Sequence, residues 1–214
     1  MILTRFIHAT LKLENNGKIL IMDPGTFSRV EIINEKQIDV LVITHLHSDH
    51  FDQELVSELI HKFPDLKVVT NSEVASKLSE FQKNITICEK NEVVTVGGFI
   101  LEAFDFAHLP IMQGTVFPKE QNTGYLVNNS LFNPADAHGA IGKLVKVLMV
   151  PHMYPTTDVT QLIAFAIAQK PQIAIPYHDV SIENLEQINL ELASALKKVG
   201  IDIRILSTGE SIPV

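Results

Sequence analysis

The chain has 214 residues and a formal net charge of −8, from 17 basic and 25 acidic side chains. This acidic balance disfavours the phosphate backbone of a nucleic acid as the main partner. Hydrophobic residues make up 46% of the sequence, enough for a sizeable core, and the length predicts a single domain over residues 1–214. The single cysteine, Cys88, cannot form an internal disulfide. No apolar run approaches the roughly 20 residues that cross a bilayer, and the first residues lack a signal-peptide pattern, so we expect a cytoplasmic protein without membrane association.

Hydrophobic periodicity and turn residues divide the chain into strands and helices. Residues 2–14 alternate loosely and predict a first strand, which is followed by a hairpin-type turn at Asn15–Lys18. Further strands are expected at 19–22, 38–43, 66–69, 85–87, 92–96, 99–106, 124–127, 130–132, 146–150, 172–175 and 201–206. Helices are expected at 51–63, from a capping box formed by Thr70 and Glu73 to about Glu80, at 158–168 and at 184–198. This pattern alone predicts only an α/β or α+β class.

The segment Thr44–His50 directly follows the apolar strand at 38–43 and is rich in metal-binding side chains. It contains His45, His47, Asp49 and His50 within six residues. Three imidazoles and a carboxylate suit a borderline cation such as zinc, and they are too many for one ion that keeps an open coordination position. The segment therefore predicts two adjacent metal ions. The alternative is an exposed histidine-rich tip without a function.

The order H-x-H-x-D-H in this segment resembles the signature of the metallo-β-lactamase superfamily. The tail from Val150 to His178 is similar to the small lactonase-like branch of that superfamily. The resemblance implies a four-layer αββα sandwich with the metal site at the edge of its two sheets. It specifies the superfamily but not the substrate.

The resemblance also assigns roles to residues outside the motif. It implies that His45, His47 and His108 bind one metal, that Asp49, His50 and His178 bind the second, and that Asp136 bridges them. Alanine precedes Asp136, where the superfamily usually has glycine. His138 is the main rival ligand. Asp23 either braces the histidine segment from behind or forms a turn before Pro24. His8 could approach the site, but a core or surface histidine is the first expectation. Pocket candidates are His152, Tyr154, Tyr177 and the loop 109–123.

The expected activity is that of a metal-dependent hydrolase. Two divalent ions, with zinc as the first expectation and manganese or iron as alternatives, would activate a hydroxide that attacks a small-molecule lactone, ester or phosphoester. Asp49 is the candidate catalytic residue, because its carboxylate can align the hydroxide or carry a proton. Two alternatives remain: a mononuclear iron oxygenase acting on persulfides, and a metal-binding regulatory protein without turnover. The sequence does not indicate an oligomeric state.

Overall fold

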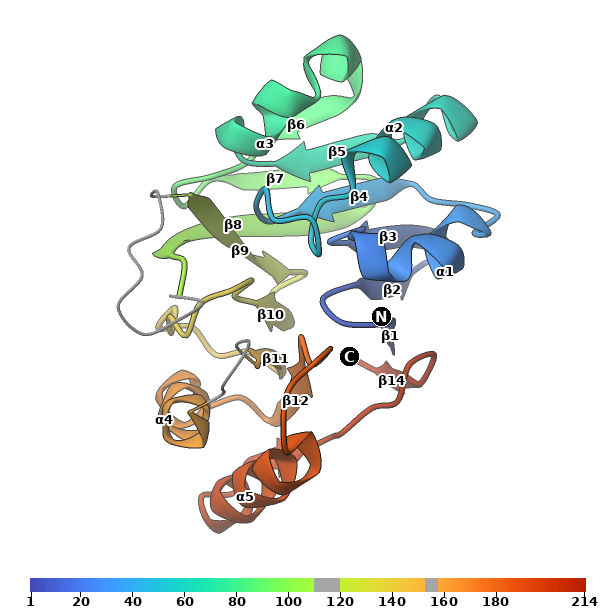
Figure 1. Ribbon diagram of the computed structural model, residues 1–214. Coiled ribbons are helices and arrows are strands. Elements are labelled where there is room, and N and C mark those ends of the chain that lie inside the picture. Colours follow the sequence, from blue (N-terminus) through green and yellow to red (C-terminus); the bar gives the residue numbers. More distant parts are fainter. Residues whose placement is uncertain (110–119, 153–157) are drawn as a thin grey trace.

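The protein is described by a computed structural model that covers residues 1–109, 120–152 and 158–214 (Figure 1). Tyr154 and most of the expected pocket loop 109–123 lie outside the described residues. The described chain forms two mixed seven-stranded sheets, which we call sheet A and sheet B. None of the helices in these residues is both long and apolar enough to cross a membrane.

Sheet A contains the first strands of the chain and the last. Its order is β14 (Ser211–Pro213), β1 (Ile2–Arg5), β2 (Leu11–Asn15), β3 (Lys18–Met22), β4 (Val40–Ile43), β5 (Lys67–Thr70) and β6 (Ile85–Ile87). The strands from β14 to β3 pair antiparallel, and those from β3 to β6 pair parallel. The parallel half places the carboxyl ends of β4 and β5 at one edge of the sheet.

Sheet B repeats this arrangement with the second part of the chain. Its order is β13 (Asp202–Ile203), β12 (Ile173–Tyr177), β11 (Val147–Pro151), β10 (Leu131–Asn133), β9 (Gln121–Val127), β8 (Phe99–Ala107) and β7 (Val93–Val96). Strands β7 to β10 pair antiparallel, and β10 to β13 pair parallel. Asn128 and Asn129 have positive φ and form the expected turn between β9 and β10.

Helices cover the outer face of each sheet, and side-chain alternation along the strands explains why. In β4, Val40 and Val42 face the core between the sheets, whereas Leu41 and Ile43 face the helices. Sheet A carries α1 (Arg29–Ile33), α2 (Gln53–Lys62) and α3 (Ser72–Lys77), and sheet B carries α4 (Val159–Gln169) and α5 (Leu185–Lys198) (Figure 1). Short 3-10 helices span Thr26–Ser28 and Ser79–Asn84. The chain is an α+β, four-layer αββα sandwich, which confirms the expected fold.

Several local predictions were wrong. Residues 2–14 form two strands, because the chain turns at Phe6–Thr10 through a hydrogen bond from the Phe6 amide to the Thr10 carbonyl, 3.0 Å long. Helix α3 is capped by Asn71, whose side chain accepts a hydrogen bond from the Val74 amide. Thr70 instead ends β5 and donates its hydroxyl to the Ile43 carbonyl. The expected strand 201–206 is reduced to β13, and neither α1 nor β14 was expected.

Candidate metal centre

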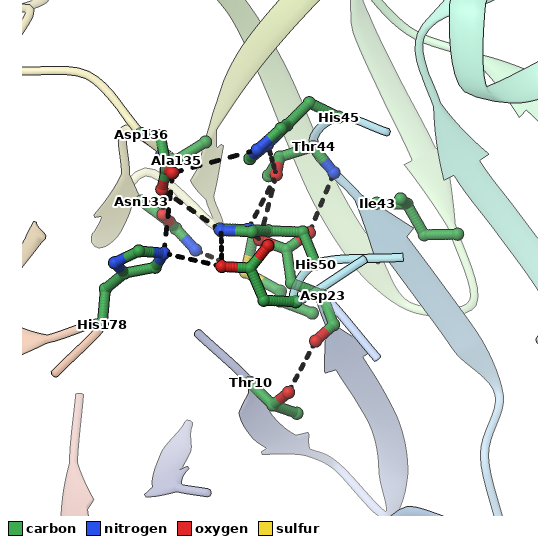
Figure 2. A network of polar contacts seen from close by, with 12 residues as sticks. Thr10, Asp23, Ile43, Thr44, His45, His50, Asn133, Ala135, Asp136 and His178 are labelled. Atoms are coloured by element: carbon green, nitrogen blue, oxygen red, sulfur yellow. Dashed lines mark hydrogen bonds and ion pairs between the residues drawn. The ribbon is translucent and has the colours of Figure 1, made fainter. Parts of the chain in front are cut away.

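The candidate ligands lie where strands of both sheets end. The histidine segment follows β4 in sheet A. From sheet B, His108 follows β8, Asp136 follows β10 and His178 follows β12. Figure 2 shows His45 and His50 from the first sheet facing His178 and the Asp136 carboxylate from the second. The structure therefore brings together residues that lie up to 133 positions apart, from His45 to His178.

The histidine segment is folded back by contacts that its sequence cannot make alone. The Thr44 amide donates to Asp23 Oδ1 over 2.9 Å, and the amides of His50 and Phe51 both donate to the His47 carbonyl. The next residue, Asp52, accepts from the Leu55 amide and begins α2. Gly25 packs against this turn so closely that a Cβ there would lie 1.8 Å from the Asp49 carbonyl oxygen. A side chain at position 25 would therefore displace the ligand segment.

One group of side chains matches the expected first metal set. Ligand atoms of His45, His47, His108 and Asp136 all lie within 4.8 Å of one another. His108 Nε2 is 3.3 Å and His45 Nε2 is 3.9 Å from Asp136 Oδ2. His45 is fully buried, while His47 keeps about a quarter of its side chain exposed at the cavity. Three imidazoles and a carboxylate form a donor set of the kind that zinc prefers.

A second group lies on the other side of Asp136. Ligand atoms of His50, Asp136 and His178 lie within 4.8 Å of one another. The Asp136 carboxylate reaches His50 Nε2 at 3.2 Å and His178 Nε2 at 3.5 Å. Asp49 Oδ2 is 3.3 Å from His178 Nε2 and 4.0 Å from His50 Nε2. Asp136 is thus shared by both groups, as a bridging ligand would be.

In four of the candidate ligand histidines, one ring nitrogen is hydrogen-bonded to the surrounding protein and the other faces the candidate centre. Each Nδ1 of four histidines faces an oxygen: Thr44 Oγ1 for His45, Asp23 Oδ2 for His50, the Leu109 carbonyl for His108 and the His152 carbonyl for His178. Thr44 itself donates to Asp23, so its oxygen is free to accept. The four Nε2 atoms are buried and have no hydrogen-bond partner, and neither has Asp136 Oδ1. Buried polar atoms without partners are costly, and cations bound within the two groups would satisfy all five.

The pKa shifts of the candidate ligands also favour a cation at this place. Burial holds the pKa of His45 well below its usual range. Burial also opposes charge on His50, but Asp136 and Asp23 raise the pKa of His50 well above its usual value. Against its own burial, Asp136 has its pKa lowered well below normal by His178 and His50. A positive charge is therefore favoured between these carboxylates, and a metal ion can supply it once the imidazoles are neutral.

Three further residues from the sequence prediction have defined places. The Asp23 carboxylate is fully buried and holds Thr44 and His50 from behind, as Figure 2 shows. His152 turns its ring away to Asn189 Oδ1 at 3.1 Å, and only its backbone carbonyl supports His178. His138 points its Nε2 at the Pro151 carbonyl and stacks on Phe165. The structure thus separates His138 from both groups of candidate ligands.

Sequence reasoning gave one residue near the centre only as a second choice and missed another. His8 was expected in the core or on the surface ahead of the site, but its Nε2 lies 3.0 Å from Asp49 Oδ2. Glu120 Oε2 lies 2.5 Å from His47 Nε2. A turn around His8 had no glycine or proline to mark it, and Glu120 stands in no motif. No local signal in the sequence points to either contact.

A cavity of about 370 Å³ opens beside the second group. Its wall includes His8, Asp49 and His178, together with Phe27, Val180 and Ser181. Phe27 keeps 47% of its surface exposed, and its ring meets the His8 ring edge-on. The cavity can therefore hold a small molecule with an apolar part next to the ligand atoms.

Comparison with known proteins identifies the family. The sequence profile of the family described as "Beta-lactamase superfamily domain" matches residues 3–178. The chain belongs to this superfamily. The matched residues include every candidate ligand of both groups. The relatives of this chain are therefore the enzymes of the metallo-β-lactamase superfamily.

Individual relatives of this superfamily member cover nearly its whole length. It is 28% identical over 188 residues to Protein Rv0786c of Mycobacterium tuberculosis, with 85% of each chain covered. It is 29% identical to the UPF0173 metal-dependent hydrolase SAR1785 of Staphylococcus aureus, covering 95% of this chain and 96% of the relative. Among solved structures, Igni18, a metallo hydrolase from Ignicoccus hospitalis, superposes with a TM-score of 0.76 at 19% identity, over 99% of this chain and 97% of the other. This last likeness supports the fold alone.

Proposed function

We propose that the protein is a metal-dependent hydrolase that uses two divalent ions to cleave a small-molecule lactone, ester or phosphoester. The observation that carries this proposal is the set of four buried Nε2 atoms and one carboxylate oxygen without hydrogen-bond partners. Each imidazole already uses its Nδ1 elsewhere, so its remaining lone pair is directed at the shared space. A full-length relative named as a metal-dependent hydrolase supports the same activity.

The donor set fits two ions better than one. The two groups contain six side chains, with Asp136 common to both, and Asp49 beside the second group is the seventh candidate ligand. An anionic oxygen between two dications offsets their repulsion. In this proposal His45, His47 and His108 hold one ion, and Asp49, His50 and His178 hold the other. Zinc suits this nitrogen-rich set, and manganese or iron are the alternatives.

Bound divalent ions would supply a water of lowered pKa and would polarise the substrate's reacting oxygen. The chain's own contribution is orientation. Asp49 stands between the second group and the cavity with 27% of its side chain exposed. Its pKa is held far below normal by the neighbouring imidazoles of His178 and His8, in spite of burial. It is therefore an ionised acceptor at neutral pH, able to orient the attacking water, or to take up a proton from that water and pass it to the leaving group.

The cavity favours an uncharged acyl substrate within this class. Phe27 and Val180 offer apolar surface, and Ser48 and Ser181 offer hydroxyl groups. Among the described residues that line the cavity none is lysine or arginine, the side chains that usually bind phosphate. A lactone or ester is therefore our first expectation, consistent with the resemblance to the lactonase-like branch.

The test combines metal analysis with a substrate panel. Protein stripped with chelator and reloaded should bind two equivalents of zinc or manganese, measured by plasma mass spectrometry. Its hydrolysis of lactones, esters, thioesters and phosphodiesters should depend on that metal. One equivalent of iron with oxygen uptake on a persulfide would favour the oxygenase instead. Two bound metals without turnover of any substrate would favour the regulatory protein.

A further inference from the structure

His8 lies in the turn between β1 and β2 and faces the candidate centre. Its side chain is 4% exposed, and its backbone has φ of 58°, in the left-handed region. Its ring centroid lies 3.9 Å from that of His178. Ligand atoms of His8, Asp49 and His178 lie within 4.8 Å of one another, close enough to hold an ion by themselves. His8 is therefore either an eighth ligand or a hydrogen-bond donor to Asp49.

A backbone amide distinguishes these two roles. The Val180 amide lies 3.1 Å from His8 Nδ1, and a backbone N–H can only donate. His8 Nδ1 must then be the acceptor, so a neutral ring carries its proton on Nε2. That Nε2 lies 3.0 Å from Asp49 Oδ2. A protonated nitrogen has no lone pair for a metal, so His8 has the wrong tautomer for a ligand.

His178 shows the opposite arrangement in the same place. Its Nδ1 faces the His152 carbonyl at 2.8 Å, an oxygen that can only accept. The proton of His178 is therefore on Nδ1, and its Nε2 lone pair is directed into the centre. Two neighbouring rings thus have opposite tautomers, each set by one backbone group.

We propose that His8 is a positioning residue that donates its Nε2 proton to Asp49 Oδ2 and is not itself a metal ligand. This inference rests on the proposed metal centre. The oxygen that His8 contacts is the one that lies nearest His178 and His50. An oxygen has two lone pairs, so His8 can take one and leave the other for an ion. The hydrogen bond keeps a partly exposed carboxylate turned toward the second group.

The His8 turn also links the two sheets at this point. The His8 carbonyl accepts a hydrogen bond of 3.1 Å from the His178 amide. The backbone of His8 thus contacts the sheet B ligand, and its side chain contacts the sheet A ligand. Two ligands of the proposed second ion are therefore held in register by one residue that is not itself a ligand.

The first experiment reads the His8 tautomer directly. Histidine labelled with 15N is followed by long-range 1H–15N correlation in zinc-free and zinc-loaded protein. We expect His8 to show a protonated Nε2 in both states, while the proposed ligand histidines change when zinc binds. Loss of the Nε2 proton of His8 on zinc binding would show that it is a ligand and overturn the inference. This readout needs no substitution, so it stands even if His8 variants do not fold.

The second experiment separates the hydrogen bond from packing. His8→Gln keeps an N–H donor at a similar distance, and His8→Met has similar length without a donor. His8→Met should weaken the second zinc equivalent and lower kcat by roughly 10- to 100-fold, with KM changed much less, and His8→Gln should recover most of the loss. Equal losses in the two variants would assign His8 a packing role and contradict the inference. His138→Met is the matched control, since the His138 side chain is half-buried but lies outside both ligand groups.

A double-mutant cycle shows whether His8 acts through Asp49. In an Asp49→Asn background, His8→Met should lower kcat and the affinity for the second zinc ion little further, because the carboxylate that His8 positions is already gone. Independent, additive effects would contradict the inference. Failure of the proposed metal centre gives a different result: the wild type itself would bind fewer than two zinc ions, while the tautomer of His8 would be unchanged.

Discussion

The two sheets build their halves of the candidate centre in different ways. Sheet A contributes four side chains from one turn of six residues, from His45 to His50. Sheet B contributes His108, Asp136 and His178 from the ends of three separate strands. The first half is encoded in one continuous motif. The second exists only after β8, β10 and β12 have assembled into the folded sheet, where they alternate with β9 and β11.

The means of orientation also differ between the halves. One buried carboxylate, Asp23, holds Thr44 and His50 and, through Thr44, His45. His108 and His178 are instead each oriented by a different backbone carbonyl. A single substitution can therefore loosen the sheet A half. In the part of the chain that the structure describes, no single side chain accepts from the Nδ1 atoms of both His108 and His178.

The largest expected effect comes from the residue that both halves share. Asp136→Asn keeps the shape of the side chain but removes the charge that offsets the repulsion between two dications. We expect at least one zinc equivalent to be lost and kcat/KM to fall by more than the roughly 100-fold that outer contacts contribute. Metal content and kinetics are measured on the same samples, with exposed Asp65→Asn as the control. Two zinc ions bound with wild-type affinity would remove Asp136 from the bridging position.

The next effect tests which sheet B histidine is a ligand. His108→Ala should lose the ion of the first group and most activity, because its Nε2 is one of the unpartnered atoms. His138→Ala should keep both ions, since the ring contacts Phe165 and the Pro151 carbonyl instead. Zinc titration of both variants measures the difference. The reverse ranking would show that the site is organised around His138.

A smaller loss of zinc affinity is expected when Asp23, which orients the sheet A ligands, is changed. Asp23→Asn preserves an acceptor for the Thr44 amide but weakens the charged contact to His50 Nδ1. Zinc affinity should fall by about 10- to 100-fold, the usual scale for groups that orient ligands. His152→Gln is the matched variant for sheet B, because it changes the side chain and keeps the carbonyl that holds His178. Equal losses in both variants would contradict the distinction between the two halves.

The smallest effect concerns pH and the His152 ring. Burial lowers its pKa to about 4, against a hydrogen bond to Asn189, whereas the unfolded chain has a histidine pKa of about 6.5. Between these values the unfolded state binds the extra proton, so the free energy of unfolding falls as the pH is lowered. From pH 7 to pH 5 His152 should account for a loss of about 2 kcal/mol. Denaturant unfolding of metal-free protein should show a smaller loss for His152→Gln than for the wild type. An identical pH dependence in the two proteins would mean that His152 does not stay neutral in the fold.

Several features with short-range sequence signals were predicted correctly from the sequence. The apolar strand before His45, the Asn128–Asn129 turn and the terminal helix at 184–198 all have short-range signals, and the structure has them within a residue or two. His108, Asp136 and His178 required a family resemblance, because single residues at strand ends form no pattern. The structure accounts for the glycine that the superfamily usually has at position 135, because the backbone there has φ of 55°, which glycine adopts without strain and alanine rarely adopts.

Contacts between distant segments were beyond sequence reasoning. The turn at His8 lacks the residues that mark turns, and an alternating pattern concealed it as one strand. Its partners, Asp49 and Val180, lie 41 and 172 positions away. Likewise, the tautomer of each histidine depends on the oxygen or amide that the fold places beside Nδ1. Such information is absent from a list of residues.

Anomalous diffraction from crystals of zinc-loaded protein would locate the proposed ions. We expect two peaks, one on each side of the Asp136 carboxylate. The first should lie among His45, His47 and His108, and the second among Asp49, His50 and His178, with His8 beyond coordination distance. A single peak, or a peak coordinated by His8 Nε2, would contradict this proposal.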